Sequence, residues 1–230
     1  MPASVLLVHD LRARAADLQP LRQLLDAAGH ETIAPDLPGH GARTAEQFSI
    51  GESLITIADA ARSLADDPVI VGHALGGHLA VQYAAATADA RVVIALGCGT
   101  EALGWLLDSY RIAANAHRVL PDQGAALSAL AATTFVGGTP RHTRTSIPGQ
   151  FGDTLGALDT LDTPGALTRL TVPVWLVNGQ FDRFRFQERA FISAAANATL
   201  VRQPGVRLAG GITRPDATVA ILEDILARLP

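Results

Sequence analysis

Short apolar runs alternate with segments of helical periodicity along the first hundred residues. The expected strands are residues 4–8, 31–34, 69–71 and 91–96. In the segments between them, apolar residues recur every three or four positions, which predicts helices over 18–28, 49–65 and 76–86. Strands that alternate with helices at this pace favour right-handed crossovers. The pattern therefore predicts an α/β fold with a mostly parallel central sheet and helices on both faces.

The alternation stops after residue 99. Residues 101–169 contain only helical or loop-like sequence, and strand-like sequence resumes at 172–177. The remaining expected elements are a helix at 184–196, a strand at 199–203 and a helix at 216–229. We therefore expect a core domain formed by residues 1–99 and 169–230, with a helical cap inserted at 100–168.

The charge pattern limits the partners that we expect. The chain has 230 residues, is 48% hydrophobic and carries a net charge of -4. Its basic residues are all arginines and are scattered, so no surface for nucleic acid is predicted. A small-molecule substrate or ligand is the expected partner. The sequence leaves the oligomeric state open, and a homodimer is one of the alternatives.

Cofactor, metal and location follow from what the sequence lacks. Its histidines have no paired ligand spacing, and neither a P-loop nor a dinucleotide fingerprint occurs, so no metal and no cofactor are expected. No apolar run approaches the roughly 20 residues of a membrane helix, and no signal peptide pattern opens the chain. The single cysteine, Cys98, cannot form an internal disulfide. A cytoplasmic protein is therefore expected.

One glycine-rich segment has the spacing of a catalytic turn. Gly-His-Ala-Leu-Gly-Gly at 72–77 follows a short apolar run and precedes an alanine-rich helix. A sharp strand-to-helix turn needs small residues two positions before and two positions after its centre. Gly72 and Gly76 meet this need, and Ala74 is the centre.

With this turn the chain resembles the α/β-hydrolase family, in which the turn reads Gly-X-Ser-X-Gly. The resemblance extends to residues 6–10, 34–41 and 174–182, and so covers nearly the whole chain. It implies the α/β-hydrolase fold; a Rossmann-like or flavodoxin-like domain is the alternative. It also implies that Ala74 stands at the nucleophile position, Asp182 at the acid and Leu208 at the triad histidine.

Three positions depart from the family pattern. Ala74 has no oxygen for attack, and Leu208 cannot relay a proton. Asp10 replaces a glycine beside the oxyanion site, where a carboxylate opposes the negative charge that develops. An engineered serine-to-alanine change accounts for Ala74 alone, and Arg207 also departs at the neighbouring glycine position. We therefore expect natural loss of the triad and little ordinary serine-hydrolase activity.

Several functions stay open at this point. Our main expectation is a repurposed non-hydrolytic enzyme, a cyclase, lyase or isomerase, acting on a small carbonyl-containing, natural-product-like substrate. Asp10 is its candidate general acid or base, but it can instead cap a helix turn or pair with Arg12 or Arg14. Asp182 is catalytic, or it is a relic that pairs with Arg183, Arg185 or Arg207. The alternatives are a catalytically silent binding protein, and an esterase or thioesterase with an engineered Ala74.

The expected pocket lies between the turn and the cap. Its candidate lining residues are His9, His73, Leu75, Trp105, Tyr110 and Arg111. Arginines outnumber carboxylates in the cap, which favours an anionic or carbonyl-rich ligand. The aromatic residues of the cap can equally well pack in its core.

Overall fold

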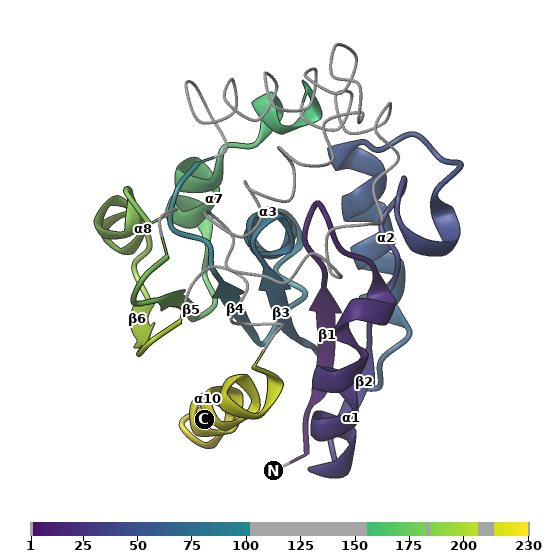
Figure 1. Ribbon diagram of the computed structural model, residues 1–230. Helices are drawn as coiled ribbons and strands as arrows, with labels where there is room; N and C mark the ends of the chain where they lie inside the picture. Colours follow the sequence, from purple (N-terminus) through teal and green to yellow (C-terminus); the bar gives the residue numbers. More distant parts are fainter. Residues whose placement is uncertain (1, 102–155, 183–184, 207–213, 230) are drawn as a thin grey trace, which may run out of the picture.

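A single parallel sheet organises the computed structural model, which describes residues 2–101, 156–182, 185–206 and 214–229 (Figure 1). The strand order is β2-β1-β3-β4-β5-β6, and each neighbouring pair is parallel. The strands are β1 (Ser4–Val8), β2 (Glu31–Ile33), β3 (Val69–His73), β4 (Val92–Leu96), β5 (Val174–Gly179) and β6 (Ala198–Gln203). The predicted α/β architecture is confirmed.

Helices cover both faces of the sheet. The α-helices are α1 (Gln19–Ala27), α2 (Ile50–Arg62), α3 (Leu75–Thr87), α7 (Thr163–Arg169), α8 (Glu188–Ala194) and α10 (Pro215–Ala227). Short 3-10 helices are η1 (Ala15–Leu18), η2 (Gly41–Arg43) and η5 (Leu158–Thr160). In Figure 1, α1 and α10 lie on one side of the strands and α2, α3, α7 and α8 on the other.

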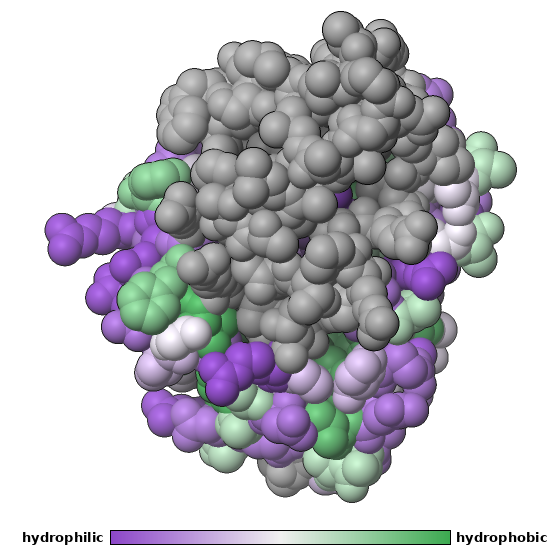
Figure 2. All heavy atoms as spheres, viewed as in Figure 1, coloured by the Kyte–Doolittle hydropathy of each residue, from purple (hydrophilic) through white to green (hydrophobic). Residues whose placement is uncertain are grey.

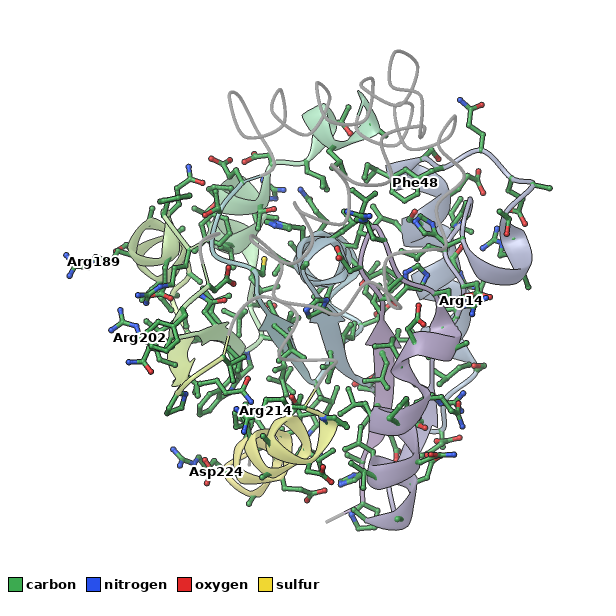
Figure 3. The ribbon with its side chains drawn as sticks, viewed as in Figure 1. Arg14, Phe48, Arg189, Arg202, Arg214 and Asp224 are labelled. Atoms are coloured by element: carbon green, nitrogen blue, oxygen red, sulfur yellow. The ribbon has the colours of Figure 1, made fainter. Side chains whose placement is uncertain are left out.

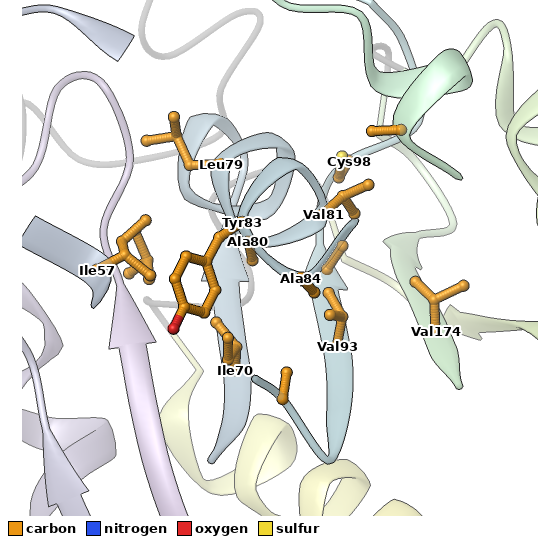
Figure 4. Close-up of a cluster of buried hydrophobic side chains, with 14 of the residues drawn as sticks. Ile57, Ile70, Leu79, Ala80, Val81, Tyr83, Ala84, Val93, Cys98 and Val174 are labelled. Atoms are coloured by element: carbon orange, nitrogen blue, oxygen red, sulfur yellow. The ribbon is translucent and has the colours of Figure 1, made fainter. Parts of the chain in front are cut away.

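Two buried apolar clusters explain this layering. One face of the sheet packs against α1 and α10 through residues such as Leu25 and Leu222. The other face packs against α2, α3, α7 and α8, where Ile57 and Leu79 are fully buried (Figure 4). Phe191 of α8 is fully buried in the same cluster. Strands β1, β3 and β4 are buried at every position because both of their faces are covered.

Two elements differ from the sequence prediction after residue 170. β5 was expected at 172–177 and runs instead over Val174–Gly179. It continues through the polar Asn178 because that amide donates to the buried Glu188 at 3.0 Å. Helix α8 was expected at 184–196, but it begins only at Glu188. Gln187, just before α8, bonds outside the helix, since its N–H donates to the Gly99 carbonyl at 2.9 Å.

Most of the predicted cap lies outside the described residues. The described part after it consists of η5 and α7, and α7 packs directly on α3 and α8. The boundary at 168 and 169 falls at the end of α7 and stays a prediction. Among the described helices, none is long and apolar enough to cross a membrane.

The described part of the surface is mixed in polarity. Figure 2 shows hydrophilic side chains interspersed with smaller apolar groups on one face. The large apolar side chains that are exposed belong to Ile55 on α2, and to Phe181 and Phe186 in the connection between β5 and α8. Among the described residues, the connections that follow β1, β3 and β5 contain the predicted site residues Asp10, Ala74 and Asp182.

Candidate active site

The candidate site lies where the direction of the sheet connections changes. β1 pairs with β2 on one side and with β3 on the other, so the chain leaves the centre of the sheet in both directions. In open α/β sheets, ligands bind beyond the carboxyl ends of the strands at such a switch point. His9 and Asp10 follow β1, and Ala74 follows β3. The fold thus brings these predicted residues to the expected position.

Ala74 has a strained backbone at the centre of the turn. Its φ of 47° and ψ of -109° lie in a region that residues other than glycine rarely adopt. Such conformations cost on the order of 1–3 kcal/mol and persist only where neighbouring structure imposes them. Here the neighbouring structure is packed so closely that only glycine fits on either side of Ala74. A Cβ on Gly72 would overlap the Gly76 carbonyl, and one on Gly76 would overlap the carbonyl of Val8.

Asp10 contacts the first turn of the helix that follows. Leu75 N–H, at the start of α3, donates to Asp10 Oδ1 at 3.3 Å. A carboxylate at the N-terminus of a helix is stabilised by the unpaired N–H groups and by the helix dipole. This contact fits the helix-capping role considered for Asp10. The same N–H is the backbone donor next to Ala74.

His9 is a scaffold residue in this structure. Its side chain is fully buried, Nδ1 lies 2.8 Å from the Asp10 carbonyl, and Nε2 accepts from Leu37 N–H at 3.0 Å. Burial lowers the pKa of His9 from 6.5 to about 4, so the ring is neutral and donates through Nδ1. The imidazole ties the loop after β1 to the loop after β2. His73, the last residue of β3, is also buried.

Asp182 follows β5 and is 4% exposed. Its N–H donates to the Gly179 carbonyl at 3.0 Å, which closes a turn. The nearby thiol of Cys98 is fully buried, and burial, together with the charge of Asp182, raises the pKa of that thiol well above its usual range. Cys98 is therefore protonated and unsuited to nucleophilic attack. A catalytic role for Asp182 stays a prediction.

Sequence reasoning missed a buried carboxylate near Asp182. Glu188 is 4% exposed, accepts from Asn178 and receives Arg202 Nη2 at 2.8 Å. Arg185, considered above as a partner of Asp182, lies 3.8 Å from the same carboxylate. Arg202 and Arg189 extend outward on this side of the molecule (Figure 3). Glu188 lies in an expected helix and Asn178 in a strand, and no sequence pattern indicates that the two side chains meet.

A second omission is His78, on α3. It is 7% exposed, and its Nδ1 lies 2.7 Å from Thr163 Oγ1. The available signal was the surroundings: α3 is apolar on nearly every side, so a polar residue within it must find buried partners.

Several predicted site residues lie outside the described residues. These are Trp105, Tyr110, Arg111 and Leu208. The pocket predicted over the turn therefore stays a prediction. A cavity of about 490 Å³ between α2 and the end of β2 contains none of the predicted site residues. In the part of the chain that the structure describes, no three His, Cys, Asp or Glu side chains gather as a metal site.

The comparisons with known proteins agree with this geometry. The sequence model of the alpha/beta hydrolase family matches residues 5–224. A thermophilic esterase from Thermogutta terrifontis is similar with a TM-score of 0.80 and 18% identity, over 100% of this chain and 91% of that chain. The enol-lactonase from Burkholderia xenovorans LB400 has a TM-score of 0.77 and 20% identity, over 99% and 92%.

A structure from work on the carboxylesterases of Nitrososphaera gargenis has a TM-score of 0.83 and 17% identity, over 99% of this chain and 91% of that chain. The search of curated proteins found no match. At these identities the likeness establishes the fold.

The expectation of a non-hydrolytic cyclase, lyase or isomerase is wrong. The similar structures are hydrolase-type enzymes, and they fit the esterase alternative better. That expectation rested on the missing nucleophile at Ala74 and the missing histidine at Leu208, with Asp10 as a possible acid or base. The two losses remove the usual covalent route, but hydrolysis by an activated water molecule needs neither group.

Proposed function

Because the chain belongs to the alpha/beta hydrolase family, we propose that it hydrolyses small carboxylic esters or related acyl compounds at the turn before α3. Water is the nucleophile in this proposal, since Ala74 has no atom that can be acylated. The observation that carries it is the contact between Asp10 Oδ1 and Leu75 N–H, which places a carboxylate and a backbone donor at one strained turn.

Asp10 is the general base of the proposed reaction. Its carboxylate takes a proton from water while the water oxygen bonds to the carbonyl carbon of the ester. The carbonyl electron pair moves to the carbonyl oxygen, and Leu75 N–H donates to the oxyanion that forms. Asp10 then returns the proton to the leaving alkoxide as the carbon–oxygen bond breaks, which yields the acid and the alcohol.

The timing of proton transfer removes the objection to a carboxylate at this place. An ionised Asp10 beside an oxyanion would be repulsive, as the sequence suggested. In general-base catalysis, however, Asp10 becomes neutral in the step in which the oxyanion forms. The hydrogen bond that it receives from Leu75 weakens at the same time, and that N–H becomes available to the oxyanion.

The contact itself supports this exchange of partners. At 3.3 Å the bond from Leu75 to Asp10 is longer than the usual 2.7–2.9 Å of a charge-assisted hydrogen bond, so it is a weak one. Leu75 is buried, and its amide is held by the first turn of α3. A fixed donor that is only weakly occupied loses little when a substrate oxygen replaces the carboxylate.

The test is hydrolysis of a panel of p-nitrophenyl esters from acetate to octanoate. We expect Asp10→Asn to lower kcat about 100-fold with a small change in KM, because the base is lost and the shape is kept. Asp66→Asn is the matched control, since Asp66 is an exposed carboxylate in the loop before β3. The intact mass of the protein during turnover should show no acyl adduct.

Three results would contradict the proposal. An Asp10→Asn variant with the parent's kcat would remove Asp10 from the reaction. An acyl adduct would show a covalent route that Ala74 cannot provide. Saturable binding of the esters without turnover by the parent would support the silent binding protein instead.

A further inference from the structure

His78 lies one helical turn after Ala74 and is buried in the interior of the protein. Its ring packs edge-on against Phe191 of α8, with the ring centroids 6.1 Å apart. It is one of few polar side chains on α3, and an unsatisfied buried imidazole would destabilise the fold. The groups around the ring therefore show what the residue does.

The ring lies between chain segments that flank residues 102–155. Nδ1 lies 2.7 Å from Thr163 Oγ1, and the backbone carbonyl of Thr100 is close enough to raise the pKa of the ring against the larger effect of burial. The tautomer that fits both neighbours has Nδ1 accepting from the Thr163 hydroxyl and the proton on Nε2. Burial lowers the pKa of His78 to about 4, so this neutral form is present at neutral pH.

Each of these segments also contacts other parts of the site. Thr100 Oγ1 accepts from Phe186 N–H at 2.9 Å, and Glu101 N–H donates to Gln187 Oε1 at 2.7 Å. The segment around Thr100 is thus joined to the connection that contains Asp182. On the other side, Leu158 and Leu161 come just before Thr163, and they belong to the same buried apolar cluster as Leu75.

We propose that His78 is a positioning residue, which holds the segments at 99–101 and 158–163 against α3 and so shapes the acyl-binding side of the turn. The role rests on the proposed ester hydrolysis. It requires no proton transfer by His78, because the buried ring stays neutral and its Nδ1 is bonded to Thr163. Loss of one bond should change how well a substrate fits more than how fast the bound substrate reacts.

Thr163→Val is the sharpest variant, because it replaces the hydroxyl with a methyl group of similar size. Thr163→Ser keeps the hydroxyl and should restore the parent's behaviour. Thr168→Val is the matched control on the same helix, where an exposed threonine donates its hydroxyl to the Gly165 carbonyl. We expect Thr163→Val to raise KM for the longer esters about tenfold with kcat within about twofold, the loss typical of one buried hydrogen bond.

Hydrogen exchange supplies a readout that does not need activity. In Thr163→Val, amides at 99–101 and 158–163 should exchange about tenfold faster than in the parent and in Thr163→Ser. Unchanged exchange in these segments would overturn the proposal, whether or not the parent hydrolyses esters. Faster exchange with unchanged KM would leave only a structural bond and would also overturn the positioning role. A parent without turnover contradicts the proposed function alone, and exchange then decides on His78.

Discussion

Acid should destabilise the folded protein through two buried histidines. His9 and His78 are nearly inaccessible to solvent, and burial lowers the pKa of each from 6.5 to about 4. Between these values the unfolded chain binds a proton on each imidazole and the folded chain does not. The unfolded state therefore binds more protons, and the free energy of unfolding falls as pH decreases through this window. Above about pH 7.5 both states are almost fully deprotonated at these histidines, which then contribute almost no pH dependence.

The pKa values give the size of the effect. The interval from 6.5 to about 4 corresponds to roughly 3 kcal/mol for each histidine once the pH is below both values. At about pH 5 the expected loss is roughly 2 kcal/mol for each, relative to neutral pH. A domain of ordinary stability has about 5–15 kcal/mol in total, so the combined loss of about 4 kcal/mol is easily measured.

Urea unfolding at about pH 7.5 and pH 5 measures this difference. His78→Gln removes one titrating ring, so the difference between the two pH values should shrink by roughly 2 kcal/mol. Thr163→Val is the control: it removes the same contact but keeps the ring, so it should lower stability at both pH values and preserve the difference. An equal pH dependence in His78→Gln and the parent would refute the reasoning.

Two further predictions concern the turn itself. Gly76→Ala should lower the free energy of unfolding by about 3 kcal/mol or prevent folding, because its Cβ would overlap the carbonyls of Val8 and His9. The control is Gly51→Ala on the exposed side of α2, where a Cβ meets no atom within 4 Å, and it should be neutral or stabilising in the same thermal unfolding assay. Ala74→Ser should leave kcat for esters within about threefold of the parent and give little labelling by a fluorophosphonate, because leucine stands at position 208, where the resemblance puts the triad histidine, and cannot take the serine proton; rapid labelling would support the engineered-alanine alternative.

The fold could be predicted because its strands are short, apolar and buried on both faces. Residues 69–71 and 91–96 were predicted as strands because each is a short apolar run, and β3 and β4 cover nearly the same residues. The predicted element bounds are wrong where a polar residue extends an element or lies outside one. Asn178 extends β5 through a bond to Glu188, and Gln187 is held outside α8 by Gly99. Both bonds join elements whose proximity the sequence does not reveal.

The site could be predicted in position but not in its contacts. Two glycines around Ala74 indicated the turn, and the order of the elements placed Asp10 beside it. That Asp10 accepts from Leu75 depends on how close α3 comes to the end of β1, which the packing of Gly76 decides. His78 was missed for the same reason, since Thr163 follows it by 85 residues in the sequence.

The strain at Ala74 is maintained by bonds that converge on the first turn of α3. Ala74 N–H donates to the Leu96 carbonyl at 2.8 Å, and the Ala74 carbonyl accepts from Gly77 N–H at 2.9 Å. Asp10, which follows β1, accepts from the next amide, that of Leu75. The methyl side chain of Ala74 has no chemical use for this conformation. The strain instead accompanies the geometry in which Leu75 N–H faces the loop after β1. A donor fixed in that way binds a developing oxyanion without reorganisation, whatever the nucleophile. For this reason the proposed water-mediated reaction needs the turn even though position 74 has no hydroxyl.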